Sequence, residues 1–314
     1  MSRAKVELAS ICHWADIDRV EVLCPPCRLP TGSFREGGNV RARLSRLTTL
    51  LVVFALMVFA VAPASAVTNG ELDGEGHPHV VLVLMDVGGE PAFRCSGTLI
   101  SPTYVLTAGH CTSNFPDDPF TGIRIFTESN VQTGNNTYPF GGGPNSVEAV
   151  RWASHPLYET APFFFHDVGI IELEEPVILD EYGVLPGLNS LDALKGGKKD
   201  FFDSVGYGLV HAQLNNPTPQ SHTDGTRERR ISHPKLIQIN TPGFTGDFSM
   251  LLSNNTKTGG TCFGDSGGPN FLAGTNVIAG VTSFGLNASC GGTGGVFRVD
   301  RQNVQDFISD FIAG

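Results

Sequence analysis

A serine among glycines, a histidine in a turn of small residues and an isolated aspartate are the side chains that nucleophilic catalysis requires. Ser266 lies in "GTCFGDSGGP", where a tight glycine-rich turn can expose the hydroxyl and aim backbone N–H groups at an oxyanion. His110 lies in "LTAGHC", after a strand-like run and beside Cys111. Asp167 lies in "FFFHDVGIIEL", where a carboxylate in an apolar run can orient an imidazole and stabilise its protonated form.

The order of these residues along the chain distinguishes two classes of hydrolase. "GDSGG" also fits G-x-S-x-G, the nucleophile elbow of α/β-hydrolases, in which the histidine follows the serine. No histidine lies beyond His233, so the general base must precede Ser266, and the strand–helix alternation of an α/β-hydrolase is missing. His166 is a poor base, because on a strand its side chain would point away from that of its neighbour Asp167.

The elements that must position these groups are mostly strands. Short apolar runs separated by Gly, Pro and Asn recur along the chain, which predicts an all-β fold. The runs are "HVVLVLMDV", "CSGTLIS", "YVLTAGH", "GIRIF", "VGIIEL", "FFDSVGYG", "NVIAGVTSFG" and "GVFRV". A helix is predicted only at the end, over about residues 301–313, with apolar residues at helical spacing and Asp300 as a cap.

Residues 1–66 are predicted to be a leader that ends in a secretory signal peptide. Basic residues precede the apolar run Leu47–Val61, and Ala64-Ser65-Ala66 fits a signal-peptidase site. An uncleaved anchor is the alternative, since the apolar segment is just long enough to cross a bilayer. The segment before it is long for a signal peptide, and our hypothesis is that residues before about 40 are not translated, with a start at Val40.

Composition and charge narrow the class of partner. With 40% hydrophobic and 17% charged residues the chain is typical of a globular protein. Its net charge of −10 argues against nucleic acid or an anionic membrane as a partner. "CPPC" at Cys24 to Cys27 resembles a redox pair, but nothing around it resembles a redox domain. We expect no cofactor and no metal, since no acidic loop suits calcium.

The cysteines beyond the leader predict disulfides. Cys95, Cys111, Cys262 and Cys290 are an even set in an exported chain, which is typical of two disulfide bonds. Four cysteines permit three connectivities, and the residues alone do not choose among them.

In their order, "LTAGHC", "DVGIIEL" and "GDSGGP" resemble the motifs of the trypsin–chymotrypsin family of serine proteases. The resemblance extends over a peptidase domain at residues 67–314. It implies two packed antiparallel six-stranded β-barrels, at about residues 77–187 and 188–300, followed by the C-terminal helix. It also implies a role for each motif: His110 as general base, Asp167 as its orienting carboxylate, and Ser266 as nucleophile.

The resemblance implies further contacts around these three residues. The backbone N–H groups of Gly264 and Ser266 would form the oxyanion hole, and Ser283 would bond to Asp167. The implied disulfides are Cys95–Cys111 beside the histidine turn and Cys262–Cys290 beside the serine loop.

The resemblance also implies where the substrate binds. Ser283, Phe284 and Gly285 would line the cleft, with Gly285 pairing with substrate backbone. Gly260 stands where a carboxylate would select Lys or Arg, and Gly285 and Gly295 stand where larger side chains would close the pocket. We therefore expect an open, uncharged pocket and a preference for bulky apolar or aromatic residues before the scissile bond.

The expected function is that of a secreted, monomeric serine endopeptidase acting on proteins or peptides, without stable membrane association after signal cleavage. An esterase with the same triad and a catalytically silent binding module are the alternatives. In the family, a new N-terminal amine pairs with the Asp before the nucleophile. "VTNG" resembles that N-terminus, so Val67 would pair with Asp265, and signal cleavage itself would activate the enzyme without a propeptide.

Overall fold

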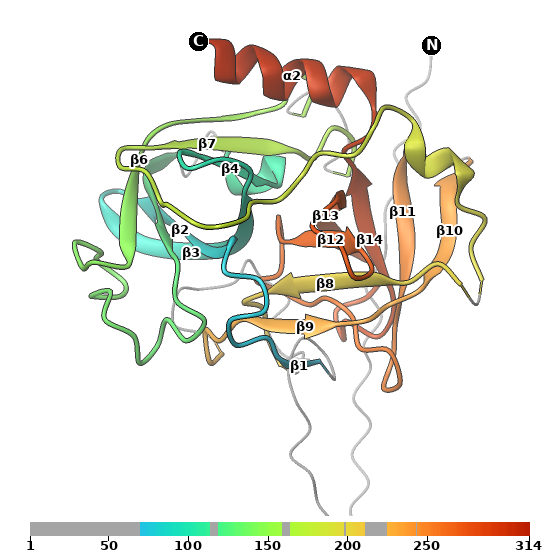
Figure 1. Cartoon of the computed structure of the whole chain (residues 1–314), viewed down its shortest axis with the longest axis horizontal. Coiled ribbons are helices and arrows are strands. Elements are labelled where there is room, and N and C mark those ends of the chain that lie inside the picture. Colours follow the sequence, from blue (N-terminus) through green and yellow to red (C-terminus); the bar gives the residue numbers. More distant parts are fainter. Residues whose placement is uncertain (1–69, 114–118, 159–163, 198, 211–224, 243) are drawn as a thin grey trace, which may run out of the picture. The chain divides into compact units, whose positions relative to one another are not determined.

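The computed structural model of the protein describes residues 70–113, 119–158, 164–197, 199–210, 225–242 and 244–314. The expected leader, its signal peptide and Val67 lie outside these ranges. Within them the chain is built from strands and one C-terminal α-helix, which confirms the all-β prediction (Figure 1). No helix in the described ranges is long and apolar enough to cross a membrane.

The first half of the described chain forms a closed antiparallel barrel. The strands run in the order β2-β3-β4-β7-β6-β5, so each is paired on both sides and the barrel has no free edge. The strands are β2 (Val80–Val87), β3 (Glu90–Leu99), β4 (Tyr104–Thr107), β5 (Phe120–Phe126), β6 (Ser146–Ser154) and β7 (Gly169–Leu173).

The second half forms an eight-stranded antiparallel sheet in the order β1-β9-β8-β12-β13-β14-β11-β10. The sheet is curved: hydrogen bonds from Phe202 N to Pro234 O and from Leu236 N to Asp200 O bring the start of β10 (Leu236–Thr241) beside the start of β8 (Phe202–Gly206). The strands are β1 (Glu71–Leu72), β8 (Phe202–Gly206), β9 (Arg230–Ser232), β10 (Leu236–Thr241), β11 (Gly246–Asn254), β12 (Pro269–Leu272), β13 (Ile278–Gly285) and β14 (Gly292–Arg298). The second half is therefore an eight-stranded sheet and not the expected closed six-stranded barrel, with β1 and β10 as its end strands.

Strand β2 shows why the apolar runs are continuous instead of alternating. Val81 and Val83 belong to the cluster that fills the first barrel. Leu82 and Leu84 point the other way, into a cluster shared with the second sheet. Because successive side chains on a strand face opposite sides, burial of both faces requires apolar residues at every position.

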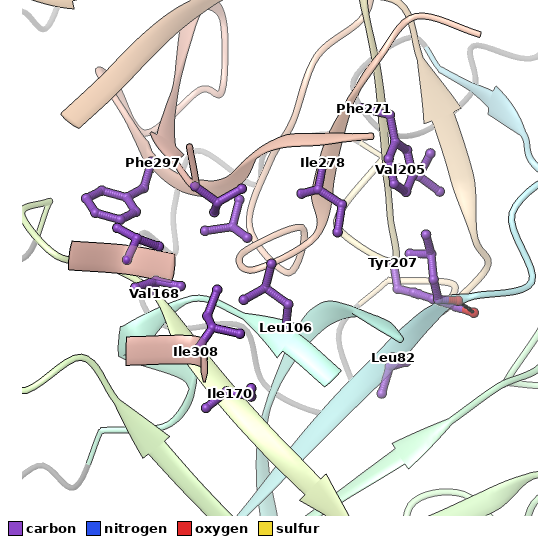
Figure 2. Close-up of a cluster of buried hydrophobic side chains, with 14 of the residues drawn as sticks. Leu82, Leu106, Val168, Ile170, Val205, Tyr207, Phe271, Ile278, Phe297 and Ile308 are labelled. Atoms are coloured by element: carbon purple, nitrogen blue, oxygen red, sulfur yellow. Dashed lines mark hydrogen bonds between the residues drawn. The ribbon is translucent and has the colours of Figure 1, made fainter. Parts of the chain in front are cut away.

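The shared cluster holds the two halves of the peptidase region together. Figure 2 shows Leu106 and Ile170 of the barrel meeting Ile278 of the second sheet and Ile308 of the helix. All four side chains are at most 1% exposed. The catalytic motifs identified in the sequence come from segments that border this cluster.

The C-terminal helix α2 (Gln302–Ala313) covers the cluster with Val304 and Ile308. Its first turn differs from the prediction, because the residue at the cap is Arg301, without a side-chain capping bond. Asp300 is fully buried and instead pairs with Arg298 at 2.7 Å and accepts the Leu191 N–H at 3.0 Å. A buried arginine needs a counter-charge, and pairing with Arg298 stabilises the protein more than a capping bond from Asp300 to the helix would.

Candidate active site

His110 lies in a single 3-10 turn, η1 (Gly109–Cys111), that follows β4. The disulfide Cys95–Cys111, with Cα atoms 6.3 Å apart, ties this turn to β3 and confirms the expected pairing. Gly109 is required by close packing, since a Cβ there would lie 3.1 Å from the Tyr158 ring and from Val168 N. The His110 side chain is 24% exposed, so part of the ring remains accessible to a substrate although the turn that carries it is buried.

Asp167 is fully buried and binds the histidine turn in two ways. It accepts the His110 backbone N–H at 2.9 Å, and its oxygens lie 3.0 and 3.1 Å from His110 Nδ1. It also accepts the Ser283 hydroxyl at 2.5 Å. These donors stabilise a buried carboxylate. A proton held on Nδ1 leaves Nε2 as the nitrogen that can take up another.

His166 is directed away from this group. Asp167 precedes β7 instead of lying on it, and His166 adopts φ +56° at the turn into the strand. The His166 ring stacks on His155, with ring centroids 4.8 Å apart. The expectation that His166 is not the base therefore agrees with the geometry, although a turn and not strand alternation separates the two side chains.

Ser266 lies in a tight loop that packs against the histidine turn. Gly267, the next residue, has φ +76°, and a Cβ there would lie 2.0 Å from Thr107 Oγ1 and 2.7 Å from Ala108 N. Thr107 and Ala108 directly precede the turn that carries His110, so only glycine allows this approach. The Cys262–Cys290 disulfide, with Cα atoms 5.2 Å apart, anchors the start of the serine loop as expected.

The charge state of His110 follows from its neighbours. Burial of the ring opposes protonation, but the charge of Asp167 and its hydrogen bond outweigh this effect and raise the pKa of His110. A base with a raised pKa holds a proton more firmly once it has taken it up. This arrangement suits a histidine that removes a proton from a hydroxyl and later returns it.

Asp265, next to Ser266, points into the protein. It is 1% exposed and accepts the Gly208 N–H at 2.7 Å and the Cys262 N–H at 2.8 Å. Burial raises the pKa of Asp265 to about 6, although these two hydrogen bonds and the charge of Arg94 act in the opposite direction. Its expected partner, Val67, lies outside the described residues.

A cavity of about 390 Å³ opens beside Ser266. Ser283, Phe284 and Gly285 line it as expected, whereas Gly260 and Gly295 do not. The face of Gly295 is covered by the Phe284 ring, 2.3 Å from where a Cβ would stand, and that of Gly260 by the Asn254 side chain, also at 2.3 Å. Phe284 therefore occupies the space that Gly295 was expected to leave open, and Asn254 separates Gly260 from the cavity.

The cavity lining carries no ionisable side chain among the described residues. Apart from the residues already named it consists of Thr261, Cys262, Phe263, Thr282, Leu286, Asn287, Ala288 and Cys290. The Asp247 carboxylate, on β11, does not line the cavity and lies 3.5 Å from the Arg301 guanidinium. An uncharged lining favours apolar ligands over cationic ones.

Among the described residues, Cys95, His110 and Cys111 are a group of metal-ligand types whose ligand atoms lie within 4.8 Å of one another. Both cysteine sulfurs are joined in a disulfide. They cannot act as thiolate ligands in that state.

The Trypsin family profile matches residues 70–308, which include the histidine turn, Asp167 and the serine loop. The chain belongs to the trypsin family of serine proteases. Among relatives, it is 24% identical to a trypsin of Simulium vittatum over 81% of this chain and 100% of the relative. It is 26% identical to a brachyurin of Leptuca pugilator, over 68% of this chain and 83% of that protein.

Solved structures give the same fold. The structure of HL collagenase aligns with a TM-score of 0.59 and 24% identity, covering 78% of this chain and 98% of that structure. A chymotrypsin of Phaedon cochleariae is 26% identical over 76% of this chain and 79% of that protein. The predicted chymotrypsin-like fold is therefore confirmed, and proteins or peptides are the substrate class of the family.

Two residues near the trypsin-family site were not found from sequence. Asn254 lines the cavity and donates its side-chain amide to Thr261 O at 2.6 Å, but the surrounding "NNT" fits only a glycosylation sequon and does not indicate a place in the pocket. Ser96 lies on β3 beside Cys95, and its contacts with the serine loop depend on the packing of the two halves. Only its position next to a cysteine of the histidine-turn disulfide could have drawn attention to it.

Proposed function

We propose that the chain is a secreted serine endopeptidase that hydrolyses peptide bonds through an acyl-enzyme intermediate, with His110, Asp167 and Ser266 as its triad. The observation that supports this most strongly is the buried Asp167 carboxylate, shared between His110 Nδ1 and the Ser283 hydroxyl. The close approach of Gly267 to Ala108 supports the placement of the nucleophile beside its base.

In the proposed mechanism, Ser266 Oγ attacks the scissile carbonyl while its proton passes to His110 Nε2. The N–H groups of Gly264 and Ser266 stabilise the negative oxygen of the tetrahedral intermediate. His110 then gives its proton to the departing amine as the C–N bond breaks, which leaves an acyl ester on Ser266. A water molecule, deprotonated by His110, hydrolyses this ester, and the proton returns to Ser266 Oγ.

The uncharged cavity supports a preference for apolar or aromatic residues before the scissile bond. An arginine or lysine side chain would lose hydration there without gaining a carboxylate partner. A panel of peptides that differ only at this residue tests the proposal. Fastest cleavage after Leu, Phe or Tyr is expected, and fastest cleavage after Arg would contradict it.

The buried Asp265 supports activation by a new amine at Val67. A carboxylate whose pKa is raised by burial is stabilised by a cation, and loss of one member of a buried pair costs about 3–5 kcal/mol. The amine's pKa would rise above its free value of about 7.7–8, so the amine carries its charge below that range and loses it, and with it the pairing, as pH rises through the raised value. Secreted active enzyme should begin at Val67, and a start several residues earlier would refute direct activation by signal cleavage.

Export is supported by the signal-peptide pattern and by the two disulfides.

The activity test compares a peptide amide with the matching ester, using secreted wild-type protein and a Ser266→Ala variant as the control. We expect both substrates to be cleaved and Ser266→Ala to abolish both activities. Turnover of the ester alone would assign the site to an esterase.

A further inference from the structure

The side chain of Ser96 bridges the barrel and the serine loop. Ser96 is fully buried on β3, and its hydroxyl donates to Gly264 O at 2.9 Å while it accepts the Tyr207 N–H at 3.0 Å. Its backbone N–H donates to Ser266 O at 2.8 Å. Thr107 Oγ1 donates to Ser96 O at 2.8 Å, so Ser96 is itself held by the strand that leads to His110.

The two carbonyls that Ser96 binds belong to Gly264 and Ser266, the residues assigned to the oxyanion hole. A hydrogen bond to a carbonyl restrains the plane of the peptide that contains it, here Gly264–Asp265 and Ser266–Gly267. These two peptides flank the Asp265–Ser266 peptide, which carries the Ser266 N–H assigned to the oxyanion hole, so both neighbours of that peptide are oriented from the barrel. Gly264 has φ +93° and no Cβ to restrict it, so its conformation depends on such external bonds.

Tyr207 extends the bridge to the Asp265 side of the loop. The next residue, Gly208, donates its N–H to Asp265 Oδ1 at 2.7 Å. The Ser96 hydroxyl therefore links the Gly264 carbonyl, directly before Asp265, to Tyr207, the residue before the donor to Asp265. The two contacts bind both sides of the serine loop to neighbouring backbone around one buried side chain.

The surroundings leave room for a hydroxyl and little else. A Cβ on Gly206 would lie 3.1 Å from Ser96 Oγ, and a Cβ on Gly268 would lie 3.1 Å from the Ser96 Cβ. Two glycines thus make the space in which the Ser96 side chain fits. Both hydrogen bonds are enclosed, so water cannot replace them without displacing packed atoms.

We propose that Ser96 is a positioning residue for the oxyanion hole, acting through the Gly264 carbonyl. The inference rests on the proposed peptidase activity and concerns how its transition state is stabilised. Ser96 touches neither substrate nor the reacting atoms. Its loss should therefore weaken binding of the transition state and leave binding of the substrate nearly unchanged.

The test compares secreted wild type with Ser96→Ala and with the matched control Thr98→Val. Thr98 lies on the same strand, is fully buried, and its hydroxyl has no hydrogen-bond partner among the described residues. In Ser96→Ala we expect kcat to fall at least about tenfold, less than the loss of a direct oxyanion donor, with KM within about twofold. Affinity for a peptide boronic acid should fall by the same factor as kcat/KM, while affinity for a non-covalent product peptide stays constant. Thr98→Val should retain wild-type values.

The outcomes separate this inference from the proposed function. A wild type without peptidase activity would refute the proposed function. An active wild type with kcat in Ser96→Ala within about twofold of wild type would overturn the role of Ser96 alone. Equal losses of boronic-acid and product-peptide affinity would also overturn it, because they indicate general disorder of the site. If Ser96→Ala does not fold, Ser96→Gly, which also lacks the hydroxyl, is held to the same criteria.

Discussion

At the scale of single residues, Asp167 accounts for most of the behaviour expected of the site. A carboxylate with no exposed surface would ordinarily be costly, but donors from two segments of the chain converge on it. The same contacts fix the orientation of the His110 ring. The same hydrogen bonds therefore orient the His110 ring and stabilise the charge of the buried Asp167 carboxylate.

The pH dependence of activity follows from this group. In the proposed mechanism neutral His110 is the base, so kcat/KM should rise as pH rises through the His110 pKa, and Asp167 places that limb above the ordinary value of about 6.5. Asp167→Asn should move the limb to lower pH and reduce kcat by about four orders of magnitude, because the ring loses its anionic partner. Initial rates between about pH 5 and 9 measure both effects. An unchanged limb in Asp167→Asn would show that another group controls the titration.

A second histidine should govern acid stability. His79 is 2% exposed, and both ring nitrogens lack a hydrogen-bond partner among the described residues. Burial, together with the charges of His77 and Arg229, lowers the pKa of His79 to about 4. The folded protein therefore cannot take up the proton that the unfolded chain binds below about pH 6.5.

The expected consequence is a loss of about 3 kcal/mol in the free energy of unfolding between about pH 6.5 and 4. Stability from this source is complete above the unfolded pKa and falls as pH falls toward the folded value. His79→Phe should keep the packing against Phe271 and remove most of this loss. Urea unfolding of the two proteins at pH 8 and pH 4.5 measures the difference. A loss of the same size in His79→Phe would assign it to other groups.

At the scale of secondary structure, helix α2 offers a matched pair of substitutions. Ile308 is 1% exposed and packs in the cluster shared by the two halves, whereas Ile312, one turn later, is 40% exposed. Ile308→Ala should cost about 2–5 kcal/mol of stability, because it leaves a cavity in packed surroundings. Ile312→Ala should cost less than about 1 kcal/mol. Thermal unfolding of both variants tests the prediction, and equal costs would mean that α2 does not seal the cluster.

Elements and motifs differ in how far the sequence predicts them. The strands and the helix were predictable, because apolar runs between turn residues and helical spacing near the C-terminus reflect local burial. Asp300 was predicted as a helix cap from its position, but its carboxylate accepts two hydrogen bonds from the buried Arg298 guanidinium instead. Gly260 and Gly295 were expected to line the pocket, but Asn254 and Phe284 fill the space beside them. Such outcomes depend on side chains that meet only in the folded protein.

At the scale of the whole molecule, the site exists because two halves of the chain pack together. His110 and Asp167 come from segments of the barrel, while Ser266 and Ser283 come from the second half. The two halves pack against each other through the cluster that contains Leu106, Ile170, Ile278 and Ile308 (Figure 2). The motifs could be read from sequence one at a time, but the Ser96 bridge between the halves could not, because its partners lie more than a hundred residues away in the chain.

The most direct test of the central claim is covalent labelling of the secreted protein with a peptide organophosphonate that carries an apolar residue next to phosphorus. Active enzyme should lose activity as one phosphonyl group is incorporated per molecule, with mass spectrometry locating it on Ser266. Labelling should be abolished in Ser266→Ala and severely slowed in His110→Ala, because the hydroxyl then lacks its base. Labelling at another residue, or none in correctly processed protein, would contradict the assignment of Ser266, His110 and Asp167 as a working triad.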